Sequence, residues 1–135
     1  MIVASCCVRA LTAASGATAQ PRCSGVVWRT LRDGTQTCPR THSLIADYGL
    51  VRLRWSAWGG ADARADGYLM CGGSGCAGTH PRSVRVKLSR RERCPDGVEI
   101  YARYDSWFYA RHRRSLVGHT GYRIPCDGMT GGGNG

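Results

Sequence analysis

The chain has 135 residues, a formal net charge of +10 and a hydrophobic content of 42%, much of it alanine and cysteine. This length allows one domain of ordinary size and excludes several, and no apolar run is long enough for an integral membrane segment. The positive charge favours polyanions as partners, such as nucleic acid or cell-wall polymers. The alternative interpretation is that the charge only keeps the protein in solution.

The first 19 residues are predicted to be a secretory signal peptide. They are rich in Ala, Val, Ser and Thr and end in Ala17-Thr18-Ala19, an Ala-x-Ala site of the kind that signal peptidase cleaves. Arg9 interrupts the apolar run, so we expect a truncated leader or a misplaced start. Val3-Ala4-Ser5-Cys6 also resembles a lipoprotein acylation site, and anchoring through Cys6 is the minor alternative to a secreted, extracellular protein.

Residues 20–128 are predicted to form the secreted β-domain, and the Gly-rich residues 129–135 a disordered tail. An even set of six cysteines beyond a secretion signal indicates three disulfides formed in an oxidising compartment. Local loop closure favours Cys23–Cys38 and Cys71–Cys76 and leaves Cys94–Cys126, although the sequence alone leaves other connectivities open. Since no second close cysteine pair completes a tetrahedral site, we expect no metal and no cofactor.

Alternation of apolar and polar residues with period two predicts the strands. On one of them Val51, Leu53 and Trp55 form the buried face. On another, Val98, Ile100, Ala102 and Tyr104 alternate with the solvent-facing Glu99, Tyr101, Arg103 and Asp105. Glycine-containing turns separate the strands, which predicts an all-β fold, either a small disulfide-bonded antiparallel sandwich or a partly open barrel. In chain order the predicted strands are 26–31, 51–56, 61–69, 84–89, 98–105 and 116–124.

The Gly59-Gly60 turn predicts a register for its hairpin. A two-residue loop would mix buried and exposed faces, so we expect a three-residue loop, residues 58–60, with one glycine at positive φ. Trp55 then lies opposite Ala63, with Leu53 opposite Ala65 and Val51 opposite Gly67.

One pattern of motifs resembles a group of uncharacterised small secreted actinobacterial proteins. The resemblance covers roughly residues 48–126 and implies a shared fold, but no activity and no catalytic residues. The chain departs from the group in the Gly-Gly-Ser-Gly between Cys71 and Cys76, where a Thr-Pro-Ser type insert is usual, and in its high arginine content. The motifs are Trp55-Ser56-Ala57-Trp58-Gly59-Gly60, Cys71 to Cys76 with Ala77-Gly78, Val84-Arg85-Val86-Lys87-Leu88-Ser89, Cys94 and Pro125-Cys126.

Aromatic and basic residues are interleaved near the C-terminus, and this pattern is typical of a platform for polyanions or glycans, because rings stack while arginines bind anions. The alternative is that most of the aromatics are core and the arginines a solvated loop. The candidate binding residues are Trp58, Tyr101, Arg103, Trp107, Arg111, Arg113 and Arg114.

The expected function is therefore that of a secreted, non-enzymatic β-domain that binds polyanions or cell-envelope glycopolymers. One alternative is a small secreted hydrolase of ribonuclease type, which would use His80, His112 or His119 with Glu92 or Glu99. A second is a protein-binding or inhibitor module that displays the Cys71–Cys76 loop. No catalytic residue is assigned, and the oligomeric state is not predicted.

Overall fold

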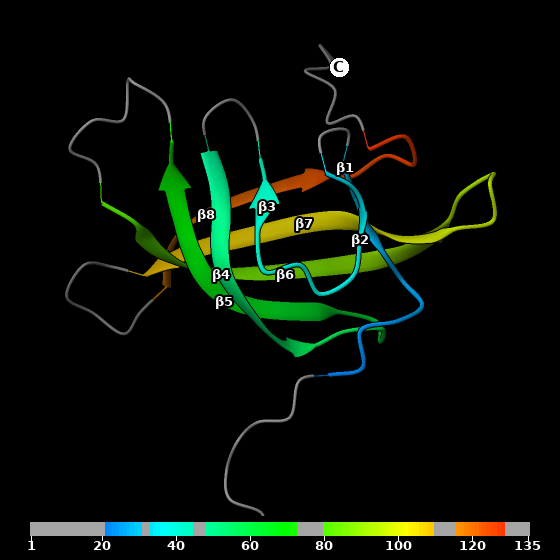
Figure 1. Ribbon diagram of the computed structural model, residues 1–135, viewed down its shortest axis with the longest axis horizontal. Helices are drawn as coiled ribbons and strands as arrows, with labels where there is room; N and C mark the ends of the chain where they lie inside the picture. The colour runs from blue at the N-terminus through cyan, green and yellow to red at the C-terminus, as the bar shows by residue number, and fades with distance from the viewer. Residues whose placement is uncertain (1–20, 31–32, 45–47, 73–79, 110–115, 129–135) are drawn as a thin grey trace, which may run out of the picture.

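The computed structural model describes residues 21–30, 33–44, 48–72, 80–109 and 116–128. A six-stranded antiparallel sheet, in the order β3-β4-β5-β6-β7-β8, curves into a half-barrel, and the hairpin β1-β2 lies across its inner face (Figure 1). This confirms the predicted all-β fold in its partly open barrel form. The strands are β1 (Trp28–Thr30), β2 (Gly34–Gln36), β3 (His42–Ser43), β4 (Tyr48–Ala57), β5 (Ala63–Cys71), β6 (Arg82–Arg93), β7 (Glu99–Tyr109) and β8 (Leu116–Arg123).

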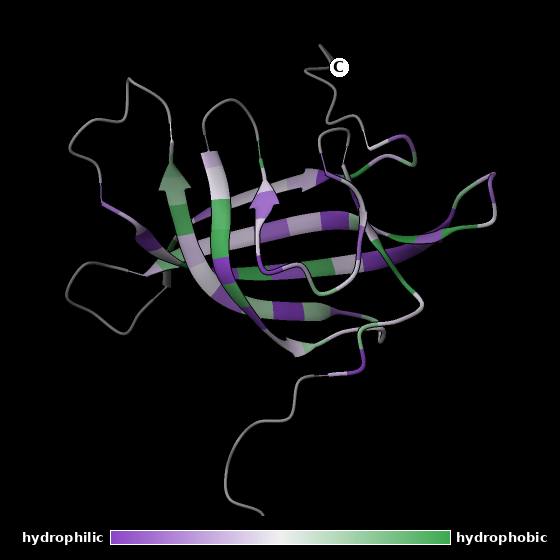
Figure 2. Ribbon diagram, viewed as in Figure 1, coloured by the Kyte–Doolittle hydropathy of each residue, from purple (hydrophilic) through white to green (hydrophobic). Residues whose placement is uncertain are grey.

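The core occupies the inner face of the curved sheet. Polar and apolar residues alternate along the strands (Figure 2), so one face of the sheet packs against the core and the other is exposed to solvent. Trp28 of β1 enters this face and contacts the Trp55 and Tyr104 rings, with centroids 6.1 and 5.8 Å away. Just before β1, Val27 forms a parallel bridge with Ile100. This segment therefore hydrogen-bonds to the first residues of β7, which β8 does not pair with.

A β-bulge at Arg52 changes the predicted facing of β4. Arg52 has a φ of 52°, and the ladder with β5 shifts register between Val51 and Arg54. Leu50 and Leu53 are consequently both buried, although they are three residues apart. The prediction that Val51 shares the buried face was wrong, because the extra residue of a bulge reverses the alternation.

The bulge also overturns the predicted hairpin register. Trp55 lies opposite Ala65 rather than Ala63, and Val51 lies opposite Tyr68. The connection between β4 and β5 consists of residues 58–62, so the three-residue loop was wrong, while Gly59 has the expected positive φ, at 84°. Trp55 still lies opposite an alanine, Ala65, so a large side chain packs against a small one as predicted, although the partner differs.

Gly67 accommodates the bulge, and this gives a testable prediction. A Cβ at Gly67 would lie 2.8 Å from Leu53 Cδ2 and 2.9 Å from the Val51 carbonyl oxygen. We expect Gly67→Ala to lower the free energy of unfolding by about 1–3 kcal/mol, because a backbone atom blocks the new methyl group. Chemical denaturation measures this.

Gly49→Ala is the matched control on the neighbouring strand. Its Cβ would meet only the His42 carbonyl oxygen, at an ordinary 3.5 Å, so the change should stay within about 0.5 kcal/mol. Equal effects of the two substitutions would contradict the role assigned to Gly67.

A second interruption of alternation lies on β7. Tyr101 and Tyr104 both join the core cluster, although they are three residues apart. The interruption coincides with Arg90 on β6, which has a φ of 57° between the pairs Ser89–Arg103 and Arg91–Tyr101. The prediction that Tyr101 faces solvent with Glu99 and Arg103 was therefore wrong.

Two of the predicted disulfides, Cys23–Cys38 and Cys94–Cys126, are present. They indicate an oxidising compartment. Cys76 and with it the predicted Cys71–Cys76 bridge lie outside the described residues, as do the predicted leader and the Gly-rich tail. In the described ranges there is no helix of the length and apolarity that crossing a membrane requires.

Candidate anion-binding site

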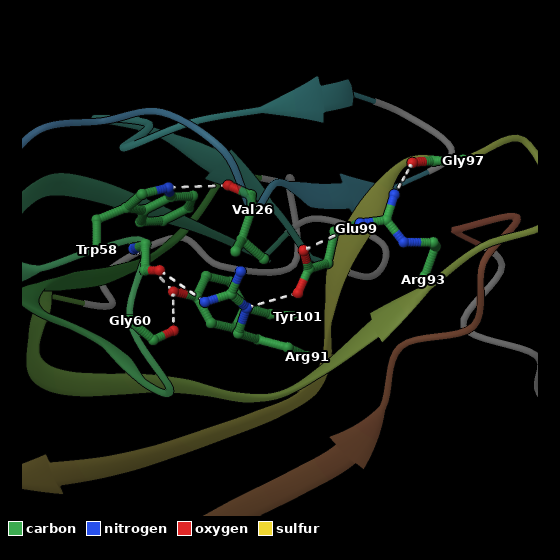
Figure 3. A network of polar contacts seen from close by, with 9 residues as sticks. Val26, Trp58, Gly60, Arg91, Arg93, Gly97, Glu99 and Tyr101 are labelled. Atoms are coloured by element: carbon green, nitrogen blue, oxygen red, sulfur yellow. Dashed lines mark hydrogen bonds and ion pairs between the residues drawn. The ribbon is translucent and has the colours of Figure 1, made fainter.

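Two of the predicted binding residues, Trp58 and Tyr101, belong to the core. Trp58 is 7% exposed and Tyr101 is 0% exposed. The Trp58 indole N–H donates to the Val26 carbonyl oxygen at 2.9 Å, and the Tyr101 hydroxyl donates to the Gly60 carbonyl oxygen at 3.0 Å (Figure 3). Both side chains tie the β4–β5 loop to the rest of the barrel, so neither is available to a ligand. Their assignment to the binding surface was wrong.

The carboxylates proposed for a hydrolase also have structural partners. The Glu99 carboxylate accepts from Arg91 Nε at 2.6 Å, and this hydrogen bond holds the pKa of Glu99 below its usual value. Arg91 also donates to the Gly59 carbonyl oxygen at 2.9 Å. Glu92 lies 3.5 Å from Arg123. Among the described residues, both carboxylates thus pair with arginines.

Arg103 and Trp107 lie on the outer face of β7, where Asp105 lies between them. The Asp105 carboxylate accepts from Arg103 Nε and Nη2, each at 3.0 Å, and lies 2.7 Å from His119 Nε2 on β8. Burial raises the pKa of Asp105, but these hydrogen bonds outweigh it and keep the pKa below its usual value. Gly121 makes room for the cluster, since a Cβ there would lie 2.6 Å from Asp105 Oδ1.

The contact with Asp105 orients the His119 ring. With Nε2–H directed to the carboxylate, Nδ1 of the neutral ring is an acceptor, and the side chain is 46% exposed. The ring stacks on Trp107, with centroids 5.1 Å apart. This arrangement can bind an anion when His119 is protonated, or accept a proton when it is neutral. The carboxylate partner of His119 is Asp105 rather than the predicted Glu92 or Glu99, because the β7–β8 register brings the His119 and Asp105 side chains together.

A groove lies beside the bulge on the same outer face, with a volume of about 490 Å³. Arg52 and Arg54 are exposed there, and their side chains make no hydrogen bond or ion pair within the described part of the chain. The groove is lined by Arg52, Arg54, Asp66, Gly67, Tyr68, Ser83, Val84 and Tyr109.

Asp66 is the only carboxylate among these lining residues, and it is already engaged. It accepts from Arg85 Nε at 3.2 Å and from the Tyr109 hydroxyl at 3.4 Å. The Arg85 guanidinium also lies 5.6 Å from the Tyr109 ring centroid. The positive charge of Arg52 and Arg54 is therefore left for a ligand.

Of the remaining predicted residues, Arg111, Arg113, Arg114 and His112 lie outside the described residues, and His80 is exposed at the start of the segment leading to β6. Of the predicted binding residues, Arg103 and Trp107 share the outer face of β7, whereas Trp58 and Tyr101 meet in the core, with ring centroids 5.5 Å apart. The alternation that places Arg52 and Arg54 on one exposed face is visible in the sequence, but the groove is not, because it depends on the bulge.

Comparisons with family models, with curated proteins and with solved structures find no match to this chain. The resemblance to small secreted actinobacterial proteins therefore remains a prediction. The fold class rests on the structure alone.

Proposed function

We propose that the protein is a secreted, non-enzymatic β-domain that binds anionic polymers through the groove beside the Arg52 bulge. The observation that carries this proposal is the pair Arg52 and Arg54, which line the groove and whose side chains form no ion pair with any described residue, Asp66 included. Guanidinium groups bind phosphate, sulfate or carboxylate in two-pronged geometry. The Tyr68 and Tyr109 rings at the same groove offer apolar contact beside the charge.

The backbone at Arg52 supports the same proposal. A non-glycine residue at positive φ costs roughly 1–2 kcal/mol, and such strained positions are concentrated at functional sites. Here the strain belongs to the bulge that presents Arg52 beside the groove. The net charge of +10 adds a long-range attraction for any polyanion.

The test is the affinity of the oxidised protein for polyphosphate at two salt concentrations, with and without the double substitution Arg52→Gln/Arg54→Gln. We expect affinity to fall steeply with salt. We expect the variant to lose about tenfold in affinity or more, and its log–log salt slope to be shallower by about 2, one for each lost contact.

Arg22→Gln/Arg90→Gln is the matched control. It removes the same charge from two exposed arginines that do not line the groove, and it should weaken binding only slightly. An affinity that does not depend on salt concentration, or equal losses of affinity in the two double variants, would count against the proposal.

A further inference from the structure

The strand register places five side chains of the outer face in one row across the sheet. Arg54 lies opposite Asp66, and Asp66 lies opposite Arg85. Arg85 lies opposite Trp107, which lies opposite His119. Because neighbouring strands are about 4.8 Å apart, the row is roughly 19 Å long. It joins the groove at one end to the His119–Asp105 cluster at the other.

This row lies on the convex side of the half-barrel, since the core cluster and the β1-β2 hairpin occupy the concave side (Figure 1). A stiff duplex touches a convex surface over a short length only. A flexible single strand can follow the curvature across the strands, as it does on other sheet surfaces that bind nucleic acid.

The rings of the row are placed for stacking. Tyr109 and Trp107 are two residues apart on β7 and so share the outer face, and Trp107 continues into the stacked His119 ring. Unpaired bases stack on such rings whatever their sequence. Sugar hydroxyls would instead need acceptors, and Oδ1 of each of the two carboxylates, Asp66 and Asp105, already accepts from two side chains.

We propose that the outer face binds single-stranded nucleic acid across the strands, from the groove to His119. Backbone phosphates bind Arg52 and Arg54, and bases stack on Tyr109 and on the Trp107–His119 pair. This inference rests on the proposed function and names its ligand. An anionic glycopolymer is the competing outcome of the test.

The test compares a fluorescently labelled oligothymidylate series with polyphosphate of matched charge and with the corresponding duplex. We expect the affinity for the oligonucleotide to rise with length and to level off on the order of four nucleotides. It should exceed the affinity for polyphosphate and for duplex. Trp107→Ala should lose about 5- to 150-fold in oligonucleotide affinity, as expected for one stacked base, and leave polyphosphate binding unchanged.

Intrinsic fluorescence supplies an independent readout. Trp28, Trp55 and Trp58 are buried, whereas Trp107 is partly exposed. Stacked bases should therefore quench the emission of Trp107, while polyphosphate should not. Tyr48→Ala removes another exposed ring, 47% exposed and outside the row, and should leave both affinities unchanged.

The outcomes separate the two proposals. If the unsubstituted protein binds no polyanion at all, the proposed function is overturned. Equal affinity for polyphosphate and oligonucleotide, tighter binding of an anionic glycopolymer, or no effect of Trp107→Ala overturns only the single-strand inference. Polyphosphate binding by Trp107→Ala reports that the variant is folded, and Trp107→Leu, which keeps apolar bulk without a π face, should show the same selective loss.

Discussion

Replacing both cysteines of the Cys94–Cys126 bridge by alanine is expected to lower the free energy of unfolding by about 4 kcal/mol. The bridge closes a loop of 32 residues, and cross-linking stabilises by removing that loop's freedom from the unfolded chain. The same change at Cys23–Cys38, which closes 15 residues, should cost about 3 kcal/mol. Denaturant midpoints of the two double variants measure both values.

The location of the longer bridge supports a large effect. Cys94 is buried at the end of β6, and Cys126 follows β8, the edge strand, so the bond holds the last strand to the sheet. The Arg29 guanidinium, which donates to the Cys126 carbonyl oxygen at 2.8 Å, adds only one contact there. A loss below about 1 kcal/mol, or a larger loss at Cys23–Cys38, would contradict the chain-entropy explanation.

The fold could be predicted to a large extent because its signals are local. The alternation around Val84, Val86 and Leu88 lies within one strand, and the Cys23–Cys38 pair lies within one short loop. Both can be predicted directly from the spacing of residues along the chain. The predicted strands correspond to β1 and β4–β8, whereas the short β2 and β3 carry too few residues to show a period.

Three of the errors, the facing of Val51, the hairpin register and the facing of Tyr101, coincide with residues of positive φ that are not glycine. Arg52 and Arg90 each interrupt the period of two, and arginine gives no signal that it will adopt this conformation. The bulge at Arg52 moved Val51 out of the core and shifted the hairpin register. The interruption near Arg90 moved Tyr101 in.

The candidate site was only partly predictable for the same reason. Arg103 and Trp107, both named as candidate binding residues, share the outer face of β7 by simple alternation, but the predicted strand ended at residue 105. Asp105 and His119 meet only through the β7–β8 register, which shifts between Trp107 and Phe108. Such a pairing depends on which strands become neighbours, and no local pattern encodes it.

The second large effect is expected from pH, through the buried His42. His42 is 2% exposed. Its ring stacks on the Trp28 indole, with centroids 3.4 Å apart, and its Nδ1 lies 2.7 Å from Gln36 Oε1. Since Oε1 can only accept, Nδ1 carries the proton. Nε2 is buried with no hydrogen-bond partner among the described residues, so a second proton there would be unsatisfied and the neutral ring is the form that fits. Burial lowers the pKa of His42 to about 4, and the nearby Asp33 carboxylate only partly opposes this.

The sign of the pH dependence follows from that shift. In the unfolded chain His42 takes up a proton near pH 6.5, whereas in the folded protein it does so only near pH 4. The stabilisation is therefore complete above pH 6.5 and is lost progressively as the pH falls towards 4, by about 3 kcal/mol in all. His42→Phe keeps a ring against Trp28 but cannot be protonated, so its free energy of unfolding should depend much less on pH across this window. Parallel slopes for the two proteins, measured by denaturation at pH 7 and pH 4.5, would show that another group governs the acid sensitivity.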